Sequence, residues 1–177
     1  MKETTVFSVN DTVMYGNSGV CKIMDIRPEK FGGDTVTYYV LKPVYDGSST
    51  IYCPVDSGKM KMRKLLSIDE IYELIKIMPD METEWVENEQ LRKEKFNKIV
   101  RQGNHEELIR PIKTLHFKRQ ERLEAGKKFY IADEKIMKEA EKILHGEFAH
   151  VLNIQLEEVV PFIMGELNNP EKGGAAC

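Results

Sequence analysis

The stretch Phe7-Ser-Val-Asn-Asp-Thr-Val-Met-Tyr-Gly-Asn-Ser-Gly-Val20 sets the pattern for the N-terminal third of this chain. It contains a short apolar run, Thr12 to Tyr15, which is stopped by Gly16-Asn-Ser-Gly19, a turn by composition. A second apolar run follows from Val20 to Ile26. This alternation of short apolar runs with tight turns predicts β-structure rather than helix.

More short strands follow at spacings of about 8 to 12 residues, which is typical of small barrels and sandwiches. Gly32-Gly33-Asp34 is a hairpin signal. The run after it is rich in β-branched and aromatic residues, as strands are. The five predicted strands are Thr12–Tyr15, Val20–Ile26, Thr35–Pro43, Thr50–Pro54 and Met60–Lys64. We therefore predict a small β-barrel over residues 1–66.

From Ser67 onward the apolar residues follow the helical period. Ser67-Ile-Asp-Glu70 is a capping box, and Met78-Pro79 should end the helix that it starts. Further helices are predicted at Thr83–Gln102, from Asn104 onward, from an Asp133 cap, and at Gln155–Met164. Pro111 would either kink or end the helix that begins at Asn104. The predicted class is α+β with the two kinds of structure segregated. A helical domain over residues 67–168 follows the barrel, with a flexible tail at 169–177.

Composition indicates a soluble protein without disulfides. The chain is 41% apolar, enough for packed cores, and it shows neither a membrane-length apolar run nor a signal-peptide core. Three widely spaced cysteines fit reduced thiols, and Cys21 and Cys53 lie in apolar strands as small core residues. We expect a cytoplasmic location.

Motifs of enzymes are absent from the sequence. There is no glycine-rich phosphate loop and no Cys-x-x-Cys pair, and the four histidines lack metal-ligand spacing. We therefore expect no catalytic residues, no metal and no cofactor.

The net charge of −3 hides a strongly basic block. Residues 92–128 carry 12 bases and 5 acids, a net of +7, between acidic flanks of −5 each at 79–91 and 129–177. Such clustering indicates one surface that faces a polyanion, although lysines on amphipathic helices are often simply solvent-exposed. Contacts to nucleic acid here would be mainly to phosphates.

Trp85, the only tryptophan, lies just before this block. Tryptophan is usually well buried, so the sequence alone favours packing against the helical core or between the domains. If it is exposed, its large flat side chain is suited to stacking on bases or wedging between them. Two interpretations are also open for the strand Thr50–Pro54. It is either an internal strand of the sheet or an exposed edge strand that could pair with another chain.

Several segments together resemble the CarD/CdnL family of bacterial transcription regulators. They run in order along nearly the whole chain: Val9-Asn-Asp-Thr-Val-Met-Tyr15, Gly19-Val20, Tyr39-Val-Leu-Lys42, Pro54, Glu84-Trp85, Arg119-Gln-Glu-Arg122, Asp133-Glu-Lys135, Ala140-Glu-Lys-Ile-Leu144 and Glu147-Phe-Ala149. The N-terminal part is similar to the RNA-polymerase-interacting domain of the transcription-repair coupling factor.

The resemblance implies a Tudor-like barrel that binds the β-subunit lobe of RNA polymerase through an edge strand. It also implies a helical domain that contacts promoter DNA at the upstream edge of the bubble and modulates open-complex stability. The matching polymerase-binding residues are Thr50, Ile51, Tyr52 and Cys53. Trp85 matches a tryptophan that wedges into the minor groove, largely without sequence specificity. By this resemblance the protein is a monomer, not an enzyme, and associates with the nucleoid through polymerase.

The sequence also departs from the family pattern. Relatives often have arginine where this strand has Tyr52, and Val86-Glu-Asn-Glu89 replaces basic residues that follow the tryptophan in some relatives. From charge and proximity we predict DNA contacts by Arg92, Lys93, Lys95, Arg119 and Arg122 besides Trp85. Two alternatives stay open: a protein–protein adaptor with no direct DNA role, and a DNA-binding protein that acts without polymerase.

Overall fold

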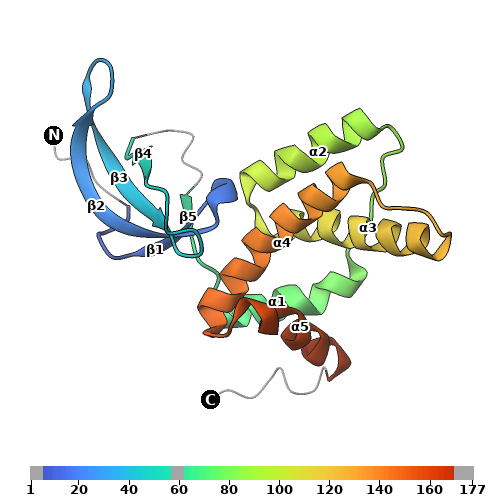
Figure 1. Cartoon of the computed structure of the whole chain (residues 1–177). Helices are drawn as coiled ribbons and strands as arrows, with labels where there is room; N and C mark the ends of the chain where they lie inside the picture. The colour runs from blue at the N-terminus through green and yellow to red at the C-terminus, as the bar shows by residue number, and fades with distance from the viewer. Residues whose placement is uncertain (1–5, 57–61, 170–177) are drawn as a thin grey trace.

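The computed structural model describes residues 6–56 and 62–169. An antiparallel sheet comes first in the chain and helices follow it, so the predicted segregated α+β class is confirmed (Figure 1). The tail predicted for 169–177 lies outside the described residues apart from Asn169, as do Met60 and Lys61 of the fifth predicted strand. The five strands are β1 (Thr12–Tyr15), β2 (Val20–Lys30), β3 (Thr35–Pro43), β4 (Ile51–Pro54) and β5 (Met62–Lys64).

The sheet has the order β4-β3-β2-β1-β5, and every neighbouring pair is antiparallel. Among the described residues β4 and β5 do not pair with each other, so the sheet is open and the predicted barrel closure is not confirmed. The predicted Gly32-Gly33 hairpin joins β2 to β3, and β2 bends strongly next to a bulge between Ile23 and Asp25 (Figure 1). Bulges increase strand bending and twist.

One face of the sheet carries its own core, in which Tyr39, Leu41 and Ile23 are fully buried. Cys21 and Cys53 belong to this core as free thiols, which confirms their prediction as small core residues. Burial raises the pKa of Cys21 to about 11, so this thiol stays protonated and unreactive near neutral pH.

The helices begin and end largely where local signals place them. The capping box of Ser67 and Glu70 starts the first helix, and Gly103, with φ +66°, ends the second. The third runs without interruption through the buried Pro111. The helices are α1 (Ile68–Ile77), α2 (Glu89–Gln102), α3 (His105–Glu124), α4 (Ile131–Leu152) and α5 (Val159–Asn168), with short 3-10 helices η1 (Gly16–Ser18), η2 (Met78–Asp80) and η3 (Leu156–Glu158).

Two helix starts differ from the prediction. The helix expected from Thr83 begins only at Glu89, because the Asn88 side chain accepts from the Leu91 N–H and caps the helix there. Residues 83–88, Trp85 included, are therefore not helical. Asp133 does not cap α4, which already begins at Ile131; its carboxylate is turned inward to a buried ion pair instead.

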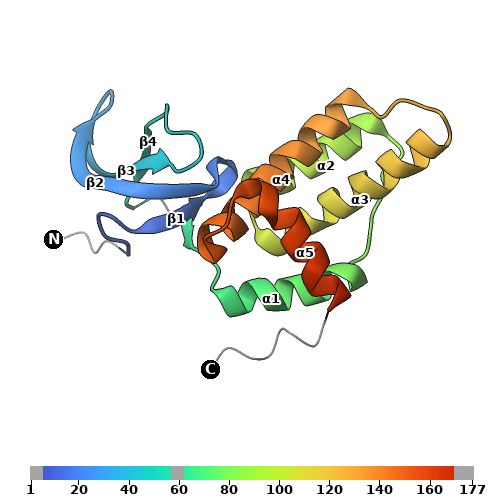
Figure 2. The same ribbon diagram turned by 60° about the horizontal axis from the view of Figure 1, so that its bottom comes forward.

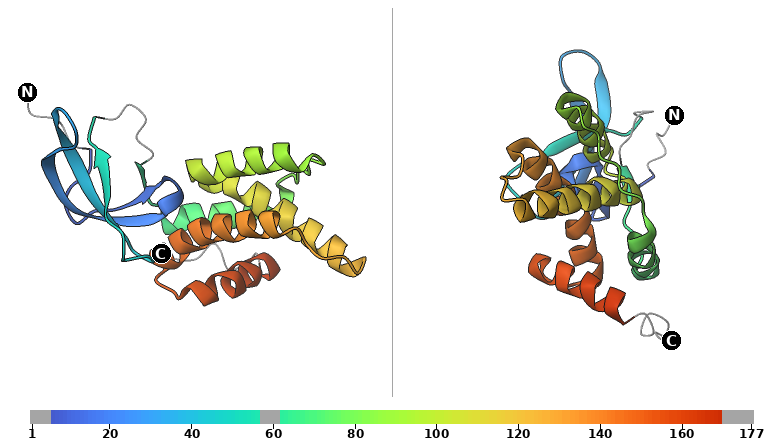
Figure 3. Two further views of the ribbon diagram at one scale, coloured as in Figure 1. Left: turned by 45° about the horizontal axis from the view of Figure 1, so that its top comes forward. Right: turned by 90° about the vertical axis from the view of Figure 1, so that its right-hand side faces the viewer.

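Sheet and helices share a core. Met14 of β1 and Val20 of β2 pack in one cluster with Phe96, Leu115 and Ile143 of the helices. In Figure 2 the sheet sits at one end of the helical part, and α1 and α5 lie side by side within that part. The left panel of Figure 3 shows α4 running from the far end of the helical part back to the sheet. The division at residue 66 stays a prediction.

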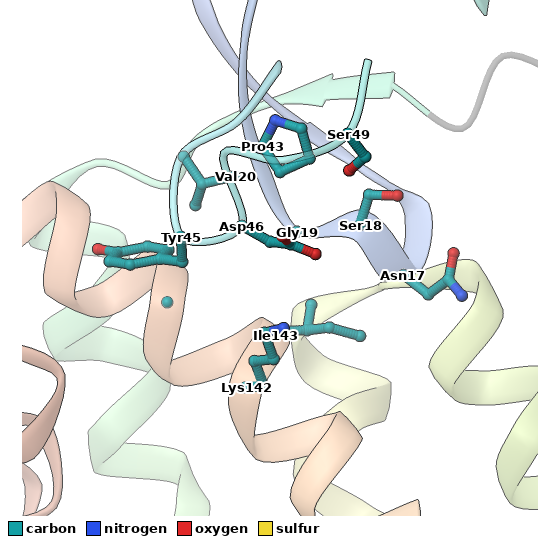
Figure 4. A pocket seen from close by; sticks show the side chains of 11 residues that line it. Asn17, Ser18, Gly19, Val20, Pro43, Tyr45, Asp46, Ser49, Lys142 and Ile143 are labelled. Atoms are coloured by element: carbon teal, nitrogen blue, oxygen red, sulfur yellow. The ribbon is translucent and has the colours of Figure 1, made fainter. Parts of the chain in front are cut away.

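Two glycines allow the sheet and the helices to approach closely. A Cβ on Gly103 would lie 2.5 Å from the carbonyl oxygen of Gly16. The Tyr45 ring lies flat against α4 at Gly146, beside a cavity of about 200 Å³ between η1, the β3–β4 loop and α4 (Figure 4). This cavity contains none of the predicted site residues.

A buried carboxylate also joins the two parts. Glu147 of α4 has no exposed surface, and its two oxygens accept from Arg63 at 2.7 and 2.8 Å. The Leu66 N–H donates to the same carboxylate at 2.9 Å, and Arg63 also reaches the Gly103 carbonyl at 3.3 Å. Because the carboxylate is fully paired, the end of the sheet is held to α2 and α4 in one orientation.

Candidate interaction surfaces

Trp85 lies in the non-helical segment 83–88 and is partly buried against the core shared by sheet and helices. Its ring stacks on that of Tyr130, with centroids 6.5 Å apart and planes at 23°. The Arg92 guanidinium lies 4.0 Å and the Lys118 ammonium 5.0 Å from the Trp85 ring centroid. Both distances are within the range of cation–π attraction. We call Trp85, Tyr130, Arg92, Lys118 and Arg122 the tryptophan cluster.

Arg92 holds the cluster together from inside. It is 1% exposed, and its Nη2 donates to the Asp133 carboxylate at 2.8 Å. The Nη1 group of Arg92 donates to the carbonyls of Val86 and Glu87, so the same side chain ties down the segment that carries Trp85. A buried arginine held by a carboxylate and two carbonyls orients the tryptophan and presents no exposed donor to a phosphate.

Arg122 marks the exposed side of the cluster. Its guanidinium lies 4.1 Å from the Tyr130 ring centroid, donates to the Tyr130 hydroxyl at 3.0 Å, and donates to the Lys128 carbonyl at 2.9 Å. These contacts fix the α3–α4 loop, which also carries the exposed Lys127 and Lys128. Arginine planes that stack on aromatic rings are well suited to contacts with nucleic acid.

The remaining predicted DNA-binding residues are placed as follows. Lys93 forms an ion pair with Glu89, and Lys95 forms one with Glu84; both pairs are at least partly exposed. The Lys95 ammonium is the main reason that the pKa of Glu84 is lowered. Arg119 is half-buried on α3. The structure thus brings Trp85 and Arg122 together in the cluster and leaves Lys93, Lys95 and Arg119 around it.

Arg92 is 1% exposed and paired with Asp133, so in this structure it is not presented at the surface, and its contact with DNA stays a prediction. Of the other bases in the block, Lys113 is also used internally and donates to the carbonyls of Met78, Pro79 and Met81. Within the described residues no ion pair engages Lys98, Arg101, Arg110, Arg119, Arg122, Lys127 or Lys128. Five of these cations are exposed, and Arg119 and Arg122 are half-buried.

Sequence reasoning did not single out Tyr130, Lys118 or Asp133 as parts of this site. Lys118 was only one base in the block. Tyr130 follows Phe129 in the loop before α4, an aromatic pair in a polar loop that could have drawn attention. Asp133 lies 41 residues from Arg92, so its pairing had no local signal.

The predicted polymerase-binding residues lie on and beside β4, and β4 is an edge of the described sheet. Thr50 just before it is exposed, Tyr52 is 36% exposed, Ile51 is half-buried and Cys53 is buried. The Val55 N–H donates to the Thr37 carbonyl at 2.9 Å, so by the two-residue repeat Ile51 and Cys53 also direct their backbone groups to β3. The Tyr52 N–H therefore points away from β3 at the open edge.

Beside this edge lies a group of exposed aromatic side chains. The rings of Phe31, Tyr38 and Tyr52 meet edge to face, with centroids 5.2 to 6.3 Å apart. Phe31 is 59% exposed, and Arg27 donates to the Tyr52 hydroxyl at 3.3 Å. Aromatic residues with arginine are the side chains enriched at the energetic centres of protein interfaces. β4 and the α3–α4 loop lie at opposite ends of the molecule (Figure 1).

Two of the described histidines lie together at α3 and α4, whereas the buried Nδ1 of His105 has no hydrogen-bond partner in the described structure. His116 pairs with Glu141 across α3 and α4, and His145 lies nearby with its pKa lowered by burial. In the parts of the chain that the structure describes, no three metal-binding side chains are grouped for an ion. Likewise, none of the described helices combines the length and apolarity that crossing a membrane requires.

The chain thus combines an open antiparallel sheet that has an aromatic edge with helices that carry an aromatic and cationic cluster, and these are its two candidate binding surfaces. Residues 7–66 match the family model of the CarD-like/TRCF RID domain. The chain therefore carries a CarD-like domain of the RNA-polymerase-interacting type, and the resemblance is confirmed over these residues. The match covers about a third of the chain and ends just before α1.

The match indicates the general class of function. A domain of this type points to a transcription-related protein that interacts with RNA polymerase. The comparison with curated proteins gives no match.

Proposed function

We propose that this protein binds the RNA polymerase β subunit through the β4 edge and contacts promoter DNA through the tryptophan cluster. It would thereby change the lifetime of the open complex. The observation that carries the proposal is the placement of an aromatic, cation-flanked cluster at the end of the molecule opposite the edge strand. A protein with two surfaces so placed can span from polymerase to the DNA beside it.

Binding by strand addition would explain the polymerase contact. At the open edge the backbone of Tyr52 has donor and acceptor groups for a partner strand. Phe31, Tyr38 and Tyr52 would provide apolar contact area beside that edge. In this proposal the bent sheet corresponds to the Tudor-like barrel of the family, and the protein acts in the cytoplasm on the nucleoid as a monomer.

Tethering would let a weak DNA contact suffice. Once the sheet holds polymerase, the tryptophan cluster is present at high local concentration near the upstream edge of the bubble. A ring that fits only a distorted minor groove shifts the equilibrium toward melted DNA by its differential affinity. The surrounding cations would contact phosphates and carry no sequence preference.

The first test measures open-complex lifetime with purified polymerase, without the protein and with wild type, Trp85→Ala and Trp85→Phe. Wild type should lengthen the lifetime, Trp85→Ala should lose most of that effect, and Trp85→Phe should keep part because phenylalanine can also act as a wedge. Equal lifetimes with wild type and Trp85→Ala would refute the role of this ring in DNA contact.

The second test concerns the edge strand. Tyr52→Pro removes the outward N–H while leaving the β3–β4 hydrogen bonds in place, and Tyr52→Ala removes only the side chain. Strand addition predicts that binding to isolated β subunit weakens more for Tyr52→Pro than for Tyr52→Ala. If both variants bind alike, the backbone edge does not form the contact. Circular dichroism of both variants serves as the folding control.

One observation favours the adaptor alternative. Trp85 packs on the core, and its buried Nε1 has no hydrogen-bond partner in the described structure. If the ring is only structural, the protein would bind polymerase without any DNA contact. Intact polymerase binding with an unchanged open-complex lifetime would support that reading.

A further inference from the structure

One face of α3 carries a row of cations on both sides of the segment that holds Trp85. Arg110, Thr114, Lys118 and Arg122 are spaced four residues apart, so each lies next to the following one in a row that turns slowly around the helix. At 1.5 Å rise per residue the row is roughly 18 Å long. Thr114 is buried near its middle, whereas Arg110 is exposed and Lys118 and Arg122 are half-buried.

The tryptophan segment crosses this row at Thr114. The hydroxyl of Thr114 accepts from the Glu84 N–H at 3.0 Å, which fixes the residue just before Trp85. Lys118 and Arg122, on the C-terminal side of the crossing, belong to the tryptophan cluster. Arg110 lies one helical turn to the N-terminal side of the crossing.

On that other side α2 and α3 enclose a cavity of about 410 Å³. Lys95, Lys98 and Arg110 line it together with two acids, Glu84 and Glu107. Glu84 is neutralised by Lys95, and Arg110 also helps to lower the pKa of Glu84. Lys98 and Arg110 are exposed and have no ion pair among the described residues, so the cavity presents two cations against the exposed Glu107.

We propose that Lys98 and Arg110 form a second phosphate-binding arm that contacts the DNA backbone on the side of Trp85 opposite Lys118 and Arg122. This inference rests on the proposed DNA contact and adds to it. A wedge in a minor groove about 6 Å wide has a phosphate backbone on each side. Cations on both sides of the ring hold both strands, and this stabilises the kinked duplex that a wedge creates.

The experiment uses the full chain with polymerase and promoter DNA. The protein concentration that gives half of the maximal lifetime extension is measured over a series of potassium chloride concentrations. Each phosphate contact contributes about 0.9 to the slope of log affinity against log salt. Lys98→Gln and Arg110→Gln should each reduce this slope by about 0.9, and the double variant by about twice as much.

The matched control is Lys76→Gln on α1, which removes an exposed helical lysine away from both surfaces and should leave the slope unchanged. Lys127→Gln with Lys128→Gln tests the exposed cations of the α3–α4 loop, which lie beside Arg122 on the other side of Trp85. If that pair reduces the slope while Lys98→Gln and Arg110→Gln do not, the second arm is overturned and the proposed function stands. If wild type extends no lifetime, or no cation and no Trp85 variant has any effect, both fail.

Discussion

Asp133→Asn tests whether the buried ion pair holds the tryptophan cluster. The carboxylate of Asp133 has no exposed surface, and Arg92 is 1% exposed. The variant keeps one oxygen that can accept from Arg92, but it removes the negative charge and leaves the guanidinium buried without a counterion. Removing one partner of a buried ion pair costs about 3 to 5 kcal/mol. Because asparagine keeps an acceptor, we expect a loss near 3 kcal/mol.

The assay is urea unfolding followed by circular dichroism and by the fluorescence of Trp85, the only tryptophan. The midpoint should fall with little change in the m-value, as for a pure stability effect. Native fluorescence should change as well, because Arg92 both faces the Trp85 ring and binds the carbonyls of Val86 and Glu87.

The control is Glu139→Gln, which removes an acid from the same helix as Asp133. Glu139 pairs with the exposed Lys135 at the surface. Exposed pairs contribute little, so this change should cost less than about 0.5 kcal/mol. A double-mutant cycle with Arg92→Met and Asp133→Leu then measures the coupling energy between the two side chains. The double variant should regain much of the stability that each single variant loses, because apolar side chains replace both charges. If Asp133→Asn costs no more than Glu139→Gln, the buried pair does not anchor the site.

Two further predictions concern stability. Gly103→Ala should lower the free energy of unfolding, measured in urea, by more than ~2 kcal/mol. The left-handed φ of Gly103 and a contact of 2.5 Å with the Gly16 oxygen both oppose a side chain there. Gly126→Ala is the control, because Gly126 shares the positive φ without such a contact, and it should cost less. Burial holds the pKa of His145 below its ordinary value of 6.5. As the pH falls below 6.5, the unfolded state therefore binds a proton that the folded state does not, and the free energy of unfolding declines. His145→Gln should flatten that decline; an unchanged pH profile would contradict the assignment.

Much of the sheet could be predicted because its signals are local. The β-branched and aromatic run Thr35–Pro43 is observed with the predicted bounds, and the glycines at 32 and 33 form the hairpin turn. Closure of the barrel could not be predicted in the same way. It depends on whether β4 and β5 pair with each other, and the composition of these strands does not determine that long-range pairing.

The candidate site was predictable in its position and less so in its chemistry. Trp85 and Arg122 were singled out and the structure brings them near each other through Tyr130. Its charge predicts Arg92 at the surface, yet Arg92 is buried in an ion pair with Asp133, which comes from another helix. A base near a tryptophan in sequence gives no information on which side of a packed helix its charge will face.

The sequence by itself determined what depends on neighbouring residues: strands, turns, the Ser67 capping box, and the end of α2 at Gly103. Only the tertiary structure decided which cations are consumed inside and which remain for a partner. It also placed β4 at an edge and set both surfaces at opposite ends. The physical reason is that local conformation is fixed by short-range sterics and hydrogen bonds, whereas burial and charge pairing depend on elements that meet only after the chain has packed.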